Sequence, residues 1–422
     1  MDSSLWRSSS KELRKYKCLK GDLHVDFLVI GGGFTGCSAA LAASEAGASV
    51  ALLEAHSIGH GGSGRNVGLV NAGLWLPPDE VESVMGAEVG QALNHALAGA
   101  PDEVFDLIAR HGIQCEATRN GTLHLAHAPR GLRDLEMRLA QQEARQAPVA
   151  LLDAAETARR TGTNAYHGAL HDRRAGTVQP LAYVQGLARA AQDAGAEIFT
   201  ESPVKALAHD GRLWHATTAH GTVRAKNCLL ATNAYHLGID GVQEARSTQV
   251  SFFQLATEPL PKRIGETILA GGEGCWDTAL IMSSLRRDTA GRLIFGAMGN
   301  PEGLGHAVHR AWALKALTRL YPALEGQEIA HFWVGNIAMT SDHVPKAIRF
   351  GPNAMSLMGF SGRGIAPGTR LGRLAAAAVL SGSDQDLPLP VLEQYSERFC
   401  GTRTAYYESG ARLIHMADRV LG

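Results

Sequence analysis

Short apolar runs separated by glycine-rich turns dominate the first part of the chain. Residues 27–30 are continuously apolar, which predicts a strand buried on both faces. An Ala- and Ser-rich stretch at 35–46 predicts a helix that packs closely on a sheet and ends at Gly47. A second apolar run at 48–53 predicts the next strand. This alternation of strand and helix is typical of a parallel sheet.

Similar patterns continue along the chain and place it in the α/β class. Helices are predicted at 79–85, 102–111, 132–146, 181–194, 311–320 and 369–380. Strands are predicted at 121–127, 195–199, 202–207, 213–217, 222–224, 248–256, 278–283, 292–296, 331–340 and 354–359, with a further apolar strand within 227–235.

Three spaced glycines stand between the first predicted strand and helix. Gly31, Gly33 and Gly36 form G-x-G-x-x-G, which gives a tight turn, a close backbone approach to a pyrophosphate and close helix packing. The helix N-terminus supplies free N–H groups to that pyrophosphate. Glu54 follows the second strand, where a carboxylate can accept hydrogen bonds from an adenosine ribose. The pattern predicts FAD or NAD binding; a purely structural turn is the alternative.

A second glycine-rich loop at 59–73 follows directly after the second strand. NAD binding does not need such a loop. A flavin does, because backbone must pass close to its second phosphate and to the flat isoalloxazine ring. The loop therefore favours FAD.

The same stretch resembles the FAD-dependent amine and amino-acid oxidases of the D-amino-acid oxidase superfamily, which includes sarcosine, glycine and γ-glutamylputrescine oxidases. Residues 62–66 are similar to the loop of the γ-glutamylputrescine oxidase branch, and 58–73 are more similar still to bacterial L-pipecolate oxidases. The resemblance covers nearly the whole chain. It implies a Rossmann-like FAD-binding domain interleaved with a substrate domain on a mixed antiparallel sheet, the D-amino-acid oxidase/glutathione reductase-like fold.

Five segments of the chain alternate between these two domains. We assign 1–75, 151–235 and 346–384 to the FAD-binding domain, and 76–150 and 236–345 to the substrate domain. Residues 385–422 are expected to form a C-terminal helical extension.

The resemblance also implies which residues surround FAD. A third glycine-rich turn at 360–368 wraps the pyrimidine end of the flavin, and the backbone of Val204 bonds the adenine. Asn233 stands where the family has glycine, a mild departure because Asn tolerates positive φ. The predicted FAD-binding residues are Gly31, Gly33, Phe34, Thr35, Gly36, Glu54, Ala55, Gly62, Ser63, Gly64, Arg65, Asn66, Val67, Val204, Ala231, Thr232, Gly362, Arg363, Gly364, Ile365 and Ala366.

Two positions depart from sarcosine oxidase. The cysteine that holds its flavin covalently corresponds to the neighbourhood of Ile337, where this chain has no cysteine, so non-covalent FAD is expected. The lysine that activates oxygen there corresponds to the neighbourhood of Ile294. Either O2 or a quinone therefore stays open as electron acceptor.

The implied chemistry is hydride transfer to the flavin from a C–H next to nitrogen in a small amine or amino acid. Guanidinium groups bind carboxylates in bidentate fashion, so Arg65 and Arg363 are the first candidates for a substrate anchor, ahead of Arg286 and Arg287. Each could instead contact the flavin. Aromatic residues that could wall the substrate pocket or simply form core are Tyr235, Phe252, Phe253 and Trp333. The predicted catalytic set is Arg65, Arg363, Phe253 and Trp333.

Several substrates fit this chemistry. The resemblance favours oxidation of L-pipecolate to Δ1-piperideine-6-carboxylate in lysine catabolism, with γ-glutamylputrescine or a sarcosine- or glycine-type amino acid as alternatives. A flavin-binding protein with a structural or regulatory role, or an NAD-dependent dehydrogenase, would belong to a different class.

Composition excludes few functions. The 422 residues carry 40 Lys and Arg against 41 Asp and Glu, which gives no electrostatic argument for nucleic acid. No apolar run approaches the ~20 residues of a membrane span, and the polar N-terminus lacks a secretory apolar region. We expect a cytoplasmic protein, with loose membrane association left open. The 6 cysteines show no zinc spacing, so no metal site is expected.

Overall fold

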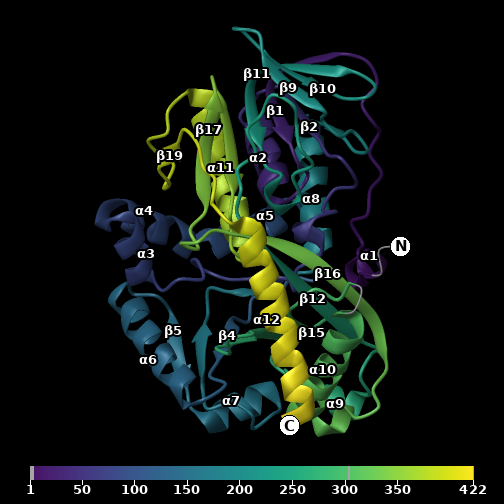
Figure 1. Ribbon diagram of the computed structural model, residues 1–422, viewed down its shortest axis with the longest axis vertical. Helices are drawn as coiled ribbons and strands as arrows, with labels where there is room; N and C mark the ends of the chain where they lie inside the picture. The colour runs from purple at the N-terminus through teal and green to yellow at the C-terminus, as the bar shows by residue number, and fades with distance from the viewer. Residues whose placement is uncertain (1–3, 303–304, 422) are drawn as a thin grey trace.

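The glycine motif directly follows an inner strand of a large sheet. In the computed structural model, which describes residues 4–302 and 305–421, nine strands form this sheet in the upper part of Figure 1. The path runs β19-β17-β18-β11-β1-β2-β8, and β10 pairs with β11 and β9 outside this path. The strands are β1 Leu23–Ile30, β2 Val50–Leu53, β8 Glu197–Phe199, β9 Ala206–His209, β10 Trp214–Thr217, β11 Thr222–Leu230, β17 Lys346–Gly351, β18 Ala354–Met358 and β19 Val391–Leu392.

β1 is flanked by β11 and β2, and both run parallel to it. Phe27, Leu28 and Val29 are fully buried, as the continuous apolar run predicts for a strand covered on both faces. The glycine-motif helix α2 (Phe34–Glu45) packs against α8 (Pro180–Asp193) and α11 (Ala366–Ser381). The predicted strand–helix–strand unit is confirmed.

A second sheet forms the lower half of the molecule (Figure 1). Within the described residues it has eight strands in the order β16-β12-β15-β14-β13-β4-β6-β5. Most neighbours are antiparallel, but β13 and β4 run parallel, so the predicted mixed sheet is confirmed. The strands are β4 Thr122–Leu125, β5 Val149–Leu152, β6 Ala169–Asp172, β12 Thr248–Thr257, β13 Gly274–Asp277, β14 Ser283–Arg287, β15 Leu293–Met298 and β16 Ile329–Met339.

The predicted strand at 278–283 is wrong, because most of this segment connects β13 to β14. The carboxylate of Asp277 accepts hydrogen bonds from the backbone N–H groups of Ala279 and Ser283 and from the Ser283 hydroxyl. These bonds fold the segment into a turn, and the strands lie on either side of it.

The predicted domain boundary at 150/151 also differs from the structure. β5 and β6 pair with each other in the second sheet, and β6 also pairs with β4. In the chain, α7 (Ala154–Thr161) lies between β5 and β6. Residues 151–172 are therefore part of the substrate domain. At the other end, β19 pairs with β17, so the C-terminal extension contributes an edge strand to the first sheet.

The remaining helices and short strands of the described chain lie outside the two large sheets. Four helices precede or flank the second sheet, namely α3 Pro78–Met85, α4 Ala87–Ala98, α5 Ala100–Arg110 and α6 Pro129–Ala144. α4 has no counterpart among the predicted helices. The remaining elements are α1 Leu5–Ser9, η1 Gly62–Gly64, β3 Leu69–Val70, β7 Gly176–Thr177, η2 Asn233–Tyr235, α9 Lys262–Gly265, α10 Gly305–Leu320 and η3 Pro322–Leu324.

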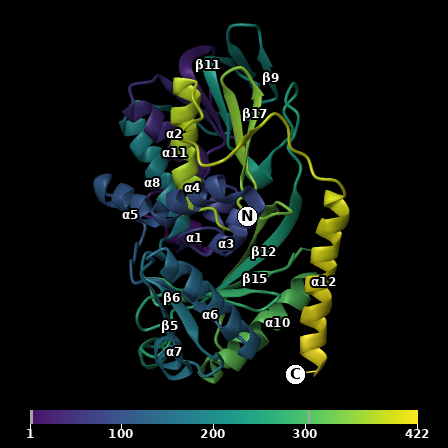
Figure 2. The same cartoon turned by 90° about the vertical axis from the view of Figure 1, so that its left-hand side faces the viewer.

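The long C-terminal helix α12 (Cys400–Leu421) lies along the outer side of the second sheet (Figure 2). It packs against β12 and α10. A buried histidine pair joins α12 to α10: the Nδ1 atoms of His309 and His415 lie 2.7 Å apart. His415 also stacks on Trp312 with a centroid distance of 3.8 Å. No helix in the described part of the chain is long and apolar enough to cross a membrane.

This histidine pair predicts a pH dependence of stability. Burial lowers the pKa of His309 to about 4 and that of His415 to about 3; Arg412 adds to the first effect, while Glu408 and Asp418 oppose them. The unfolded chain therefore takes up protons first below the ordinary pKa of 6.5, and the free energy of unfolding falls as the pH drops from 6.5 toward 4.

We expect the thermal unfolding temperature to fall over this pH window in the wild type. The fall should be shallower in a His309→Gln/His415→Gln variant, even if that variant is less stable at pH 7.5. Thermal melts at matched ionic strength measure both slopes. Parallel profiles would show that other groups cause the pH dependence.

Candidate active site

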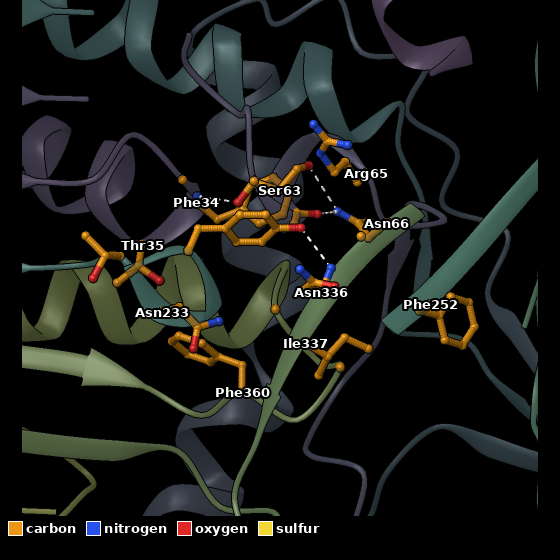
Figure 3. A pocket seen from close by; sticks show the side chains of 18 of the residues that line it. Phe34, Thr35, Ser63, Arg65, Asn66, Asn233, Phe252, Asn336, Ile337 and Phe360 are labelled. Carbon is orange, nitrogen blue, oxygen red and sulfur yellow. Dashed lines mark hydrogen bonds between the residues drawn. The ribbon is translucent and has the colours of Figure 1, made fainter. Parts of the chain in front are cut away.

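A cavity of about 650 Å³ lies between the two sheets of the described chain. Loops at the carboxyl ends of β1, β2, β11 and β18 form one wall, and residues of β12 to β16 form the other. Figure 3 shows side chains from both walls around this space. The carboxyl ends of parallel strands are where α/β folds bind their ligands.

The β1–α2 turn approaches neighbouring backbone too closely for side chains. A Cβ on Gly31, whose φ is +112°, would lie 2.7 Å from the carbonyl oxygen of Ala231. A Cβ on Gly36 would lie 1.9 Å from the carbonyl oxygen of Gly31. Gly33 caps α2, so the first free N–H groups of the helix border the cavity. This is the geometry that binds a pyrophosphate.

Glu54 follows β2 and borders the cavity. Its two carboxylate oxygens accept hydrogen bonds from the backbone N–H groups of Gly32, at 2.7 Å, and His56, at 2.8 Å. Burial raises the pKa of this carboxyl, while the two N–H groups oppose that effect. Each oxygen keeps further lone pairs that can accept a ribose hydroxyl.

Val204 lies in the same wall, and its backbone N–H and C=O form no hydrogen bond with the described chain. These two groups can serve the edge of an adenine ring, as expected from the sequence. A buried backbone group without a partner is uncommon, which supports a ligand at this point.

The second glycine-rich loop is held by the side chain of Asn66. Its amide nitrogen donates to the carbonyls of Gly62 and Ser63, at 2.9 and 3.0 Å, and its oxygen accepts from the N–H of Gly68 at 2.8 Å. The Ser63 hydroxyl accepts from the N–H of Phe34, which joins this loop to α2 (Figure 3). The two cofactor loops thus form one unit.

Arg65 has a structural role in addition to bordering the cavity. Its Nε donates to the carbonyl of His60 at 2.7 Å, and a terminal nitrogen donates to the carbonyl of Val334 on β16 at 3.1 Å. The side chain therefore connects the cofactor loop to the second sheet. The structure places it among the loop contacts rather than at a single substrate-binding position.

Asn233 has a positive φ, a conformation that Asn tolerates better than most residues. Its φ is +45°, and its side-chain oxygen accepts a hydrogen bond from the N–H of Gly359 at 2.9 Å. This bond holds the end of β11 against the third glycine-rich turn. The positive φ is consistent with the expectation that Asn is tolerated at this position.

Arg363 lies in the third turn and borders the cavity. Its guanidinium carbon is 4.7 Å from the centroid of the Trp276 ring. Burial lowers its pKa to about 10, and nearby Arg138 adds to this effect. Within residues 4–302 and 305–421, no carboxylate or carbonyl accepts a hydrogen bond from its side chain.

The side chains of the other two candidate arginines form hydrogen bonds away from the cavity. Arg286 is buried and donates to the carbonyl of Val178, and Arg287 donates to the carbonyls of Gly265 and Ile268. Neither borders the cavity. Arg363 is therefore the arginine among the four candidates whose side chain has no hydrogen-bond acceptor in the described part of the protein; its one contact of note is with the Trp276 ring.

Strand alternation decides which residues of the second sheet face the cavity. Val250, Phe252 and Gln254 of β12 border it, and so do Gly335, Ile337 and Met339 of β16. Successive side chains on a strand point to opposite faces. Asn336, between Gly335 and Ile337, also borders the cavity, so β16 follows the alternation less strictly than β12.

The prediction of Phe253 and Trp333 as catalytic residues is wrong, because neither side chain borders the cavity. Phe253 points to the opposite face of β12, where it packs against Trp312 and the His309–His415 pair. Trp333 is buried beyond the cavity, where its indole N–H donates to the Arg65 carbonyl at 2.9 Å. Neither borders the cavity, whereas Phe252 and Tyr235 do.

Most of the predicted FAD-binding residues border this one cavity. Three that do not are Gly36, Gly64 and Ala366, which shape the turns or begin α11. Residues that border it without having been predicted include Trp276, Leu280, Met282 and Met298. Their strand patterns indicate one buried face, but not that this face meets the cofactor loops. No described residue in the wall is a cysteine or a lysine.

Fold and site together define an α/β dinucleotide-binding enzyme with a second sheet over the cofactor. A family model described as FAD dependent oxidoreductase matches residues 26–378, and the chain belongs to this family. It is therefore an FAD-dependent oxidoreductase. The α2 N-terminus, Glu54 and the unpartnered backbone of Val204 fit the phosphate, ribose and adenine parts of FAD.

Two relatives span most of the chain. The probable oxidoreductase OrdL of Haemophilus influenzae is 32% identical over 376 residues, which cover 87% of this chain and 85% of the relative. The gamma-glutamylputrescine oxidoreductase of Escherichia coli is 28% identical over 429 residues, which cover 99% of this chain and 98% of the relative.

Solved structures show the same fold at lower identity. Glycine oxidase from Geobacillus kaustophilus superposes with a TM-score of 0.70 at 20% identity, covering 86% of this chain and 95% of that one. L-proline dehydrogenase from P. horikoshii gives a TM-score of 0.69 at 18% identity, covering 88% and 98%.

Gly33→Val should abolish FAD binding, because a Cβ at this position would lie 2.9 Å from the Ser63 hydroxyl and would fill the space that phosphate needs. The measurement is the ratio of visible flavin absorbance to protein absorbance after purification. Gly99→Val is the matched control, since a Cβ there meets nothing within 4 Å. A fully yellow Gly33→Val protein would contradict the assigned role.

Acid denaturation should release all flavin into the filtrate, because no cysteine borders the cavity in the described chain. Intact mass spectrometry should give the mass of the unmodified polypeptide. Flavin that stays with the precipitated protein would show a covalent link at another side chain.

Proposed function

We propose that this protein oxidises the C–N bond of a small amine that carries a carboxylate, with L-pipecolate as the first substrate to test. The observation that carries the proposal is Arg363, a guanidinium that borders the cavity without a protein acceptor. Arg363 is only partly exposed, and a cation in such a site without an anionic partner is costly; a bidentate carboxylate would compensate it.

When bound, FAD supplies the acceptor for the hydride from the carbon next to the substrate nitrogen. The protein's own contribution is to bind, orient and exclude water. Phe252, Ile337 and Met298 give the cavity an apolar wall that displaces water from the reacting carbon. Arg363 would hold the carboxylate, which fixes the orientation of the carbon beside it.

Charge in the cavity wall favours an amino acid over a polyamine conjugate. Glu54 is the one carboxylate among the described wall residues, and it lies with the cofactor loops. A long substrate with a distant ammonium group would gain no acidic partner on the second sheet. The Escherichia coli relative, named gamma-glutamylputrescine oxidoreductase, supports this conjugate as the second candidate.

The electron acceptor is O2 or a quinone. Because no lysine borders the cavity in the described residues, an oxygen-activating lysine is not part of the proposal. We place the enzyme in lysine catabolism only through the L-pipecolate assignment.

Anaerobic mixing of the yellow protein with L-pipecolate tests the proposal. We expect the flavin absorbance to bleach, and air or a soluble quinone should then restore it. γ-Glutamylputrescine, sarcosine, glycine and proline form the comparison panel. If γ-glutamylputrescine alone bleached the flavin, it would take the place of L-pipecolate as the proposed substrate. If no compound of the panel bleached it, amine oxidation would be refuted.

Arg363→Ala should raise KM for the carboxylate substrate about 10- to 100-fold, the usual range for a lost hydrogen bond to a charged group, while FAD content stays near wild type. Steady-state kinetics and the flavin-to-protein absorbance ratio measure the two effects. Arg212→Ala, on an exposed arginine of the first domain, is the control. An unchanged KM in Arg363→Ala would exclude the anchor role.

A further inference from the structure

One row of directly paired residues crosses the second sheet on its cavity face. Gln254 of β12 pairs with Gly296 of β15, Gly296 pairs with Ser284 of β14, and Ser284 pairs with Trp276 of β13. Directly paired residues on neighbouring strands point to the same face of a sheet. Gln254, Ser284 and Trp276 accordingly all border the cavity.

Gly296 makes room for the side chain of Gln254. A Cβ on Gly296 would lie 2.1 Å from Oε1 and 2.4 Å from Nε2 of Gln254. The carboxamide therefore lies over Gly296, the residue that separates Gln254 from Ser284 in the row. A larger residue at position 296 would push the carboxamide out of this place.

Two polar groups in this row are buried and have no partner. Gln254 is 1% exposed and Ser284 is 2% exposed. Neither Oε1 of Gln254 nor Oγ of Ser284 forms a hydrogen bond with any described residue. Polar groups at such depth are almost always satisfied in native proteins, so two in one row, with only Gly296 between them, point to a ligand in the cavity that both border.

The next residue in the row connects this pair to Arg363. Trp276 follows Ser284, and the Arg363 guanidinium lies over its ring at 4.7 Å. The cavity wall thus carries a cation at the Trp276 end of the row and two hydrogen-bond acceptors further along it, the Ser284 hydroxyl and the Gln254 amide oxygen. An α-amino or α-imino acid has the matching pair, a carboxylate and an N–H donor on one carbon.

We propose that Gln254 and Ser284 bind the nitrogen of an α-amino or α-imino acid whose carboxylate lies on Arg363. This assignment rests on the function proposed above. It makes the two residues determinants of specificity: they select substrates with an N–H next to the carboxylate over carboxylic acids of the same shape.

Paired ligands separate the two contacts. L-Pipecolate has the ring, the carboxylate and the N–H, whereas cyclohexanecarboxylate has the ring and the carboxylate alone. Anaerobic stopped-flow reduction gives the apparent Kd of L-pipecolate, and competition gives the Ki of cyclohexanecarboxylate. If another amino acid of the panel reduces the wild type instead, that compound and its carbon analogue take their places.

Gln254→Met and Ser284→Ala remove one polar group each with little change in volume. We expect each to raise the Kd of the amino acid about tenfold and to leave the Ki of the carbon analogue within about twofold. Gln249→Met is the matched control: Gln249 lies on the same strand, also has an unpartnered amide oxygen and does not border the cavity. It should change neither constant, and flavin content reports on folding in all three variants.

Each outcome decides between the claims. An unchanged Kd in both variants would overturn this assignment and leave the proposed function intact. Equal weakening of both ligands would also overturn it, because it would indicate general damage to the cavity. A wild type that no amine or amino acid reduces would refute the proposed function, and this assignment with it.

Discussion

The β1–α2 turn brings backbone segments closer together than side chains allow, and the rest of the structure depends on this contact. A Cβ on Gly36 would lie 1.9 Å from the Gly31 carbonyl, and one on Gly31 would lie 2.7 Å from the Ala231 carbonyl. The turn therefore fixes α2 against β1 and the end of β1 against the end of β11. Because β2 and β11 run parallel to β1, and β18 runs parallel to β11, the loops that follow these strands meet at the same edge and form one cofactor wall.

The second sheet complements this wall with side chains instead of backbone. Its cavity face combines apolar residues such as Phe252 with the buried, unpartnered Gln254 and Ser284. The one arginine of the candidate set without a protein acceptor, Arg363, comes from the cofactor side and lies over Trp276 of the sheet. In this arrangement, the loops of the first sheet position FAD. The substrate would lie between the two walls of the cavity, so the distance between the walls limits its size.

Much of the cofactor site could be predicted from the sequence, because glycine spacing, the helix after it and Glu54 are local features with direct physical reasons. The positive φ of Asn233 agrees with an expectation of another kind, which came from the resemblance to the family and from the tolerance of Asn for this conformation. The substrate wall could not. Phe252 and Phe253 are neighbours on one strand, and alternation alone does not tell which of the two faces the cavity. The predicted boundary at 150/151 cuts through β5 and places β6 in the wrong domain, because the pairing of β6 with β4 is long-range.

A crystal structure of the FAD-loaded protein, reduced and soaked with L-pipecolate, tests the account most directly. The account predicts that the carboxylate lies on the Arg363 guanidinium and that the ring nitrogen faces Gln254 and Ser284 on the second sheet. A carboxylate bound at Arg65 or elsewhere, with Arg363 turned toward the flavin, would contradict it.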